Sequence, residues 1–293
     1  EPLQLTVDTD IQFLIREELI KFQPIFKNIG SAAILMDVNN GEILSMVSLP
    51  DFNLNERKTI TDLNYINRAT KGVYELGSVF KTFTIAAGID AGLIKPETEF
   101  LDLEKKLICG KSTITEYDNK MLSDLTAEDI LIKSGNIGSV RIGQMLEIKG
   151  LKSFLEKIGV LSKIDFDIEE VGQPIPFRWG KCKLATASFG HGITTTPLQL
   201  AKAYGIITNG GFEINPTLIK NKKETNKKRL IKKNTSEAIN LILRKIVVEG
   251  TAKLANVDGY EVGGKTGTAN KPVKGGYSKK KINTFSSIFP TSN

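Results

Sequence analysis

The chain has 293 residues, of which 40% are hydrophobic and 25% are charged. This length suffices for one large domain or two small ones, and the composition is typical of a folded domain. A disordered chain, a collagen-like repeat and a disulfide-rich scaffold are therefore excluded. The formal net charge of +7 raises the question of a polyanionic partner.

The excess charge is concentrated in one segment. Residues 220–233 contain eight basic residues and one acid, which gives this segment alone a net charge of +7. A Lys-rich run with few apolar residues favours a solvated loop, whereas a nucleic-acid-binding protein presents a basic face together with a recognisable motif. We recognise no such motif, so we expect a solvated loop and no nucleic-acid partner. Nucleic-acid binding remains an alternative that rests on this run alone.

The two cysteines and the hydropathy pattern bear on the compartment. Cys109 and Cys182 have neither C-x-x-C spacing nor histidine partners, so zinc binding is not expected. A disulfide between them is compatible with the sequence but is not predicted by it. No apolar run reaches the roughly 18 residues needed to span a bilayer, and the N-terminus is not a signal peptide. We therefore expect an excised domain whose membrane anchor lies outside this chain.

The N-terminal 50 residues predict a helix and a hairpin. Asp8 is placed to cap a helix that runs from Ile11 to about Lys27. Two apolar runs follow at residues 31–37 and 42–48. The Asn-Gly pair between them is a strong signal for a hairpin turn.

The remaining pattern predicts helices enclosed by strands. From residue 78 to about 200 the spacing of apolar residues predicts mainly helices, with turns at Gly92, Gly110 and Gly150. β-like runs return at residues 260–269 and 283–289. Strands at both ends with helices between them predict an α+β fold, in which an antiparallel sheet from both termini carries an inserted, mostly helical lobe.

We expect these elements to form one domain over residues 1–293. Its α/β lobe comprises about residues 1–77 and 195–293, and its helical lobe about residues 78–194.

The segment that begins at Ser78 has the most distinctive local pattern. Residues 78–89 carry apolar side chains on nearly every face, which predicts a buried helix. Burying Lys81 is costly unless the amine is neutral or paired. Ser78 and Lys81 project from one face, and Gly77 permits a tight turn into the helix. This is a nucleophile at a helix N-terminus with a candidate base one turn away, although a capping serine and a solvent-reaching lysine explain the pattern equally well.

Two further motifs favour the catalytic interpretation. A Ser-Gly-Asn tripeptide begins at Ser134 and ends at Asn136, and a Lys-Thr-Gly tripeptide begins at Lys265. Ser-x-Asn alone is typical of a loop or a helix cap, whereas Lys-Thr-Gly is more specific. The three motifs in this order and at these intervals form a strong signal.

This set of motifs resembles the signature of penicillin-recognising serine acyltransferases. Further matching segments extend the resemblance over nearly the whole chain. They are Asn67-Arg68-Ala69-Thr70, Tyr74-Glu75-Leu76-Gly77-Ser78, Gly190-His191-Gly192, Thr196-Pro197-Leu198-Gln199-Leu200 and Glu249-Gly250-Thr251-Ala252. The chain is most similar to the transpeptidase domain of class B penicillin-binding proteins, of the septal cell-division type.

The chain departs from this family at three places. Many relatives have Pro at the position of Leu76, which only leads into the turn, and often Gln at the position of His191. The second difference argues that His191 is not a catalytic base. The family domain also continues beyond the strand at 283–289 with a central strand and a C-terminal helix, which we expect to be absent from this chain.

The resemblance implies a catalytic role for five residues. Ser78 is the nucleophile and Lys81 its base, while Ser134 relays a proton to the leaving amine. Asn136 holds the Lys81 side chain and the substrate amide, and Lys265 supplies positive potential near Ser134.

The third motif is implied to bind substrate. Thr266 and Thr268 bind the terminal carboxylate, while Gly267 leaves room for the substrate backbone along the strand. The backbone N–H groups of Ser78 and Thr268 form the oxyanion hole.

The same resemblance implies the reaction, the partners and the location. The reaction is D,D-transpeptidation, which cross-links peptidoglycan stem peptides during septal wall synthesis through an acyl-serine. No cofactor or metal is implied. The expected partners are stem peptides, β-lactams, division-complex proteins and a glycan polymerase, at the periplasmic face of the bacterial inner membrane.

Four alternatives were weighed against this interpretation. A serine β-lactamase needs a group that activates water, and no convincing Glu-x-x-Leu-Asn loop is present. A β-lactam sensor domain fits the motifs, but the division-type flanking segments disfavour it. A non-catalytic division scaffold is disfavoured by the intact motifs. A Ser-His-Asp hydrolase is disfavoured because Gly-x-Ser-x-Gly is absent and His191 is the single histidine.

Overall fold

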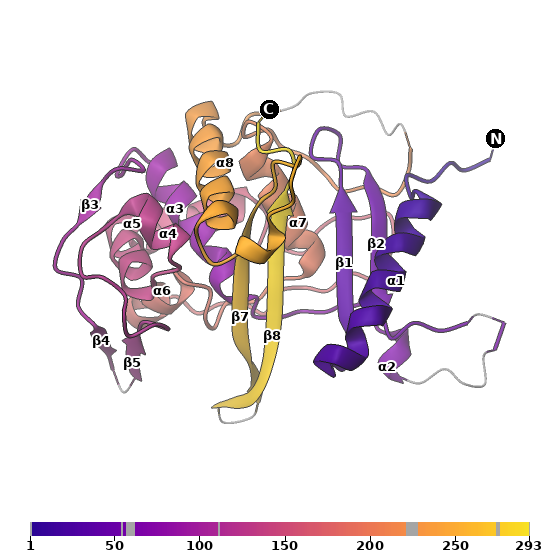
Figure 1. Cartoon of the computed structure of the whole chain (residues 1–293), viewed down its shortest axis with the longest axis horizontal. Coiled ribbons are helices and arrows are strands. Elements are labelled where there is room, and N and C mark those ends of the chain that lie inside the picture. Colours follow the sequence, from indigo (N-terminus) through magenta and orange to yellow (C-terminus); the bar gives the residue numbers. More distant parts are fainter. Residues whose placement is uncertain are drawn as a thin grey trace.

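The computed structural model describes residues 2–53, 55–56, 62–110, 112–220, 228–273 and 276–292. Its strands (Figure 1) are β1 (Ser31–Met36), β2 (Ile43–Leu49), β3 (Glu99–Phe100), β4 (Lys106–Cys109), β5 (Ser112–Thr115), β6 (Leu125–Thr126), β7 (Gly263–Val273) and β8 (Gly276–Ile288). Its α-helices are α1 (Thr9–Phe26), α2 (Asp62–Tyr65), α3 (Phe80–Asp90), α4 (Ala127–Ile132), α5 (Asn136–Lys157), α6 (Lys181–Ala187), α7 (Pro197–Thr208) and α8 (Lys233–Val248). Two 3₁₀ turns are η2 (Gly77–Val79) and η3 (Lys253–Ala255).

The N-terminal helix and hairpin form as predicted. The Asp8 carboxylate accepts the backbone N–H groups of Asp10 and Ile11 at 3.0 Å each and caps α1. The helix ends at Phe26, and Lys27 follows in the left-handed conformation with φ 50°. β1 and β2 pair antiparallel around the predicted Asn-Gly turn.

Helix α3 lies inside the hydrophobic core. Every residue of α3 from Phe80 to Gly88 is buried, which confirms the apolar pattern predicted for this segment. The helix contacts α4, α5 and α8. Polar groups inside it are paired, since Thr82 Oγ1 lies 2.9 Å from the Tyr204 hydroxyl, which donates to the Val79 carbonyl. A rigid, water-excluding support is thereby placed directly behind Ser78.

The predicted helical segment between residues 78 and 200 is less helical than expected. It contains the short antiparallel pairs β3–β6 and β4–β5, and Gly110 turns a strand hairpin rather than a helical one. Gly150 lies inside α5, whose break falls at Glu147 with φ 57° and ψ 175°. Residues 158–180 form neither helix nor strand. The lobe boundaries remain a prediction.

The strands from the two ends of the chain form two hairpins. β1 pairs with β2 and β7 pairs with β8, and within the described residues no strand joins β1 to β8. Helix α7 contacts both β1 and β8, while α8 packs against β7. The predicted antiparallel sheet is therefore present as two separate hairpins that both contact α7 (Figure 1).

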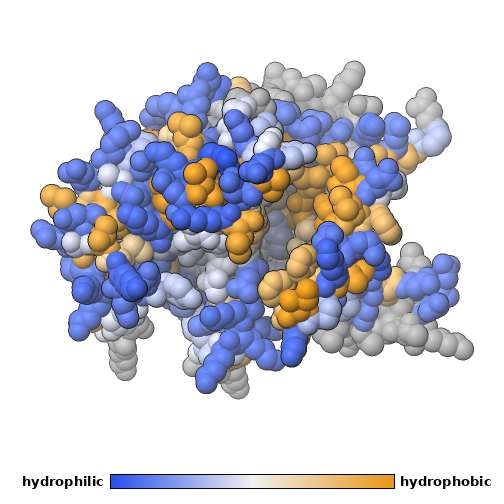
Figure 2. All heavy atoms as spheres, viewed as in Figure 1, coloured by the Kyte–Doolittle hydropathy of each residue, from blue (hydrophilic) through white to orange (hydrophobic). Residues whose placement is uncertain are grey.

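Apolar side chains gather on the surface over α1 and β1 (Figure 2). Helix α1 buries none of its residues, and Phe13 and Leu14 are 64% and 62% exposed. Even so, no helix in the described part of the chain is both long and apolar enough to cross a membrane. Half of the basic run, residues 221–227, lies outside the described residues, while Lys228, Lys232 and Lys233 at its end are exposed.

Candidate active site

Ser78 lies in η2, directly before α3, as predicted for a residue at a helix N-terminus. The preceding Gly77 has φ +68°, a conformation that L side chains rarely adopt. A Cβ at Gly77 would stand 2.6 Å from the Thr268 carbonyl oxygen and 3.0 Å from its backbone nitrogen. The strand that carries the third motif therefore runs immediately beside the turn that carries Ser78.

Two more glycines permit this close packing. A Cβ at Gly267 would lie 2.4 Å from the Leu76 carbonyl oxygen, and one at Gly190 would lie 2.0 Å from that of Gly77. Both obstacles are backbone atoms, which cannot rotate away as a flexible side chain can. The turn that carries Ser78 is thus packed between β7 on one side and the backbone at Gly190 on the other.

Two buried lysines converge on Ser134. Lys81 and Lys265 are 1% and 0% exposed, and their Nζ atoms donate to Ser134 Oγ at 3.1 and 3.0 Å. Lys81 also donates to the Ser134 carbonyl, and Lys265 to the Thr266 carbonyl at 2.9 Å. The Ser134 hydroxyl oxygen thus accepts two N–H groups, which leaves its own proton available to a further acceptor.

The surroundings of the two lysines disfavour their charged forms. Burial lowers the pKa of Lys81 well below its ordinary value, and the positive charge of Lys265 lowers it further, while Glu116 acts in the opposite direction. Burial also lowers the pKa of Lys265, to about 7. Burial and the charge of Lys265 thus both favour the neutral form of Lys81, which can accept a proton. With a pKa of about 7, Lys265 retains part of its positive charge near neutral pH.

The Ser-Gly-Asn motif joins α4 to α5. Ser134 adopts φ 61°, and Asn136 is the first residue of α5. The Asn136 side-chain amide donates to the Thr115 carbonyl at 2.7 Å. The described hydrogen bonds of Lys81 go to Ser134, whereas a bond to Asn136 was expected. Asn136 is instead held by Thr115, the last residue of β5, and follows Ser134 by two residues in the chain.

The third motif lies in β7, with its side chains on alternate faces. Lys265 and Gly267 are buried, while Thr266 is half-buried and Thr268 exposed. Thr266 Oγ1 lies 3.0 Å from Thr251 Oγ1, and Thr268 Oγ1 donates to Asn283 Oδ1 at 3.2 Å. Both threonine hydroxyls are therefore held by neighbouring side chains on the accessible face of the strand.

The match to a family model extends over most of the chain. The model for the penicillin binding protein transpeptidase domain matches residues 31–293. The chain belongs to this family. The assignment confirms the prediction made from the three motifs, and the α+β fold predicted with it.

Curated relatives place this transpeptidase domain in the class B group. It is 32% identical to a probable peptidoglycan D,D-transpeptidase FtsI of Caulobacter vibrioides, over 99% of this chain and 50% of the relative. It is 33% identical to a probable peptidoglycan D,D-transpeptidase PenA of Neisseria flavescens, over 99% of this chain and 72% of the relative. The chain thus spans half of the Caulobacter protein.

Solved structures share the fold of the transpeptidase domain. The transpeptidase domain of penicillin-binding protein 3 from Burkholderia pseudomallei superposes with a TM-score of 0.88 at 27% identity, covering 99% of this chain and 85% of that one. Penicillin-binding protein 3 from Mycobacterium tuberculosis, complexed with ampicillin, gives a TM-score of 0.90 at 25% identity, covering 99% and 70%.

Sequence reasoning missed two acidic residues of the transpeptidase domain. Glu116, which follows β5, accepts the backbone N–H groups of Asn136 and Ile137 at 2.6 and 2.8 Å. Glu75, three residues before Ser78, is 5% exposed and accepts the N–H of Gly192 at 2.9 Å. Glu75 stands within a matching segment of the family, but the pattern around Glu116 gives no signal.

The Glu75 carboxylate links the segment before Ser78 to the β7–β8 hairpin, about 200 residues later in the sequence. The Tyr277 hydroxyl, in β8, donates to Glu75 Oε1 at 3.0 Å. The His191 ring lies 4.6 Å from the Tyr277 ring, and burial lowers the His191 pKa while Glu75 acts against this effect. His191 thus contributes a ring contact in this cluster.

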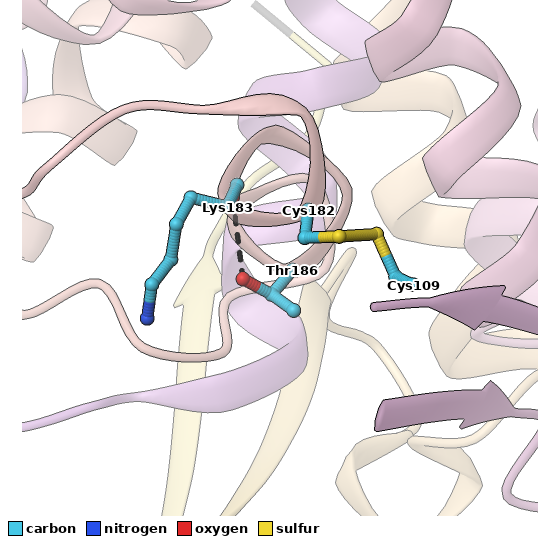
Figure 3. Close-up of a disulfide and its surroundings, with 4 residues drawn as sticks. All are labelled: Cys109, Cys182, Lys183 and Thr186. Carbon is cyan, nitrogen blue, oxygen red and sulfur yellow. Dashed lines mark hydrogen bonds between the residues drawn. A yellow bond between two sulfur atoms is a disulfide. The ribbon is translucent and has the colours of Figure 1, made fainter. Parts of the chain in front are cut away.

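The two cysteines form a disulfide, an outcome that the sequence left open. Cys109 at the end of β4 is bonded to Cys182 in α6, with their Cα atoms 5.4 Å apart. Figure 3 shows the bond beside the α6 residues Lys183 and Thr186. It fastens the β4–β5 hairpin, and with it the segment that leads to Glu116, to α6.

Proposed function

We propose that this domain is a serine D,D-transpeptidase that cross-links peptidoglycan stem peptides through an acyl-serine intermediate. Lys81 lies one helical turn beyond Ser78, and its convergence with Lys265 on Ser134 carries the proposal. A neutral buried lysine beside a serine at a helix N-terminus supplies both a base and a nucleophile. Since the chain spans half of its Caulobacter relative, the activity of the whole protein belongs to this proposal.

In the acylation step Ser78 Oγ attacks the carbonyl between two terminal D-alanines, and its proton passes to Lys81 Nζ. The oxyanion that develops is bound by the N–H groups of Ser78 and Thr268, an arrangement typically worth about 3–4 kcal/mol. The C–N bond then breaks, and the departing amine receives a proton through Ser134. The product is an ester between the peptide and Ser78.

The remaining site residues bind the substrate or supply positive potential beside Ser134. Thr266 and Thr268 bind the terminal carboxylate. Gly267 was expected to leave room for the peptide, but its missing side chain makes room for the Leu76 carbonyl and so keeps β7 beside the Ser78 turn. Lys265 adds positive potential beside Ser134, and Asn136 binds the substrate amide. In the second step an amine of a neighbouring stem peptide attacks the ester, which forms the cross-link and frees Ser78.

A septal role at the periplasmic face of the bacterial inner membrane is part of the proposal. The class B relatives support it, and the Cys109–Cys182 disulfide fits an oxidising compartment. Division-complex proteins and a glycan polymerase are the proposed protein partners, with β-lactams as inhibitors that mimic the D-Ala-D-Ala end.

Covalent labelling with a fluorescent penicillin tests the proposed chemistry. We expect a stable adduct on Ser78 in the folded domain, and none in Ser78→Ala. Absence of label on folded wild-type protein would overturn the enzymatic assignment. Rapid loss of the label would instead indicate a β-lactamase, because a transpeptidase lacks a group that activates water for deacylation.

A further inference from the structure

Glu116 fastens the end of β5 to the start of α5. Its two carboxylate oxygens accept separate N–H groups, those of Asn136 at 2.6 Å and Ile137 at 2.8 Å. The adjacent Thr115 carbonyl accepts the Asn136 side-chain amide at 2.7 Å. Thr115 and Glu116 thus accept three hydrogen bonds from the start of α5. Two of them fix the backbone and the side chain of Asn136, and the third fixes the backbone of Ile137.

The charge of Glu116 also acts on Lys81. The charged groups that act on Lys81 from the neighbouring elements are Lys265 in β7, which repels its ammonium form, and Glu116, which attracts it. The nearby Lys133 and Asp129 form an ion pair with each other at 3.2 Å. Within the described residues, Glu116 is thus the carboxylate that opposes the positive charge of this cluster.

We propose that Glu116 is a positioning residue for acylation, which holds Asn136 in place and sets a negative charge that acts on Lys81. The inference rests on the proposed function, because it takes Lys81 as the base. Two effects follow from one side chain. Charge-assisted bonds at a helix N-terminus are stronger than neutral ones, and a nearby anion favours the protonated form of an amine.

The rate of acylation by a fluorescent penicillin, measured against pH, separates these effects in Glu116→Gln. Acylation requires neutral Lys81, so the rate rises with pH through the Lys81 pKa. Loss of the Glu116 charge lowers that pKa, and we expect the acid limb to move to lower pH by about one unit. The plateau rate falls about tenfold, because charge-assisted bonds to α5 are lost.

Two matched variants distinguish positioning from general destabilisation. Glu116→Asp keeps the charge, and we expect its acid limb to stay near that of the wild type even where its rate falls. Asp129→Asn removes another capping carboxylate, the one at the start of α4, and should leave the acid limb in place. An unmoved acid limb in folded Glu116→Gln, or an equal shift in Asp129→Asn, would overturn the inference.

A second measurement does not depend on activity. In protein with ¹³C-labelled lysine, NMR titration of the Lys81 side chain should give a lower pKa in Glu116→Gln than in the wild type. If the wild type takes no label, the proposed function fails. If it is labelled but the Lys81 titration is the same in both proteins, the role of Glu116 alone fails.

Discussion

Lys81 and Lys265 share one acceptor, so the charge state of each depends on the other. Both donate to Ser134 Oγ, and two ammonium groups at this separation in a buried site repel each other strongly. Burial lowers the pKa of both lysines, and the charge of Lys265 lowers that of Lys81 further. The division of roles between base and electrostatic partner thus follows from burial and mutual repulsion.

Replacing Lys265 should shift the pH dependence in the direction opposite to that expected for Glu116. Lys265→Met keeps an apolar chain of similar length but removes the charge that lowers the Lys81 pKa. The acid limb of penicillin acylation should therefore move to higher pH, with a plateau rate reduced by about tenfold or more. The exposed Lys281→Met is the control. An acid limb that stays in place would show that Lys265 does not act on Lys81.

At this scale the sequence predicted individual residues better than their partners. The sequence contains a second Ser-x-x-Lys, at Ser278 and Lys281, which lacks the apolar pattern that surrounds Ser78 and Lys81. The structure gives the reason, since Ser278 and Lys281 lie in β8, where residues three apart face opposite sides. Glu116 could not be predicted, because its role arises only when β5 meets α5.

Among the elements, the β7–β8 hairpin extends well beyond the motif that it carries. β8 is 13 residues long, and its far end is held at Glu75 by Tyr277. Burial and the Glu75 charge raise the pKa of Tyr277, so its hydroxyl remains a donor at neutral pH. One strand thereby connects the end of the hairpin to the turn that presents Ser78.

Loss of the Tyr277 hydroxyl should loosen the end of the hairpin. In Tyr277→Phe we expect the free energy of unfolding to fall by about 1 kcal/mol, since one hydrogen bond to a carboxylate is lost from a partly exposed site. Hydrogen exchange around residues 276–282 should become faster. Urea unfolding and exchange measured by mass spectrometry check both effects. Tyr260→Phe, at a side chain 63% exposed, is the control, and identical behaviour of the two variants would contradict the link.

Local signals predicted the elements where one pattern dominates. Three elements were predicted from neighbours in sequence, and all three are present. They are the Asp8 cap, the Asn-Gly turn and the mainly apolar helix α3. The β4–β5 pair and the break at Glu147 were missed. Short strands and helix breaks of this kind are decided by tertiary packing and by the disulfide, which leave little trace in periodicity.

For the whole molecule, the division of the sheet into two hairpins leaves the outer edges of β1 and β8 without a partner strand among the described residues. In the described part of the chain, β1 pairs with β2 alone and β8 with β7 alone. Phe285 in β8 is 45% exposed and Phe289 after it 53%, and apolar side chains cover the neighbouring surface (Figure 2). Edges of this kind are templates for pairing with another chain.

The 293-residue polypeptide should therefore self-associate as its concentration rises. Ser287→Lys places a charge on the β8 edge, a device that natural edge strands use against pairing, and should reduce the association. Ser153→Lys adds the same charge on the exposed surface of α5 and should have no effect. Light scattering over a concentration series measures the outcome. A monomer at every concentration would contradict the prediction.

The disulfide has a further consequence for the integrity of the site. The bond between Cys109 and Cys182 closes a covalent ring that contains Glu116, Ser134 and Asn136. A protease that cuts once anywhere inside this ring produces two polypeptides that stay joined as one molecule. The nicked protein keeps its second motif tethered beside the Ser78 helix, and the fragments part only after reduction and unfolding.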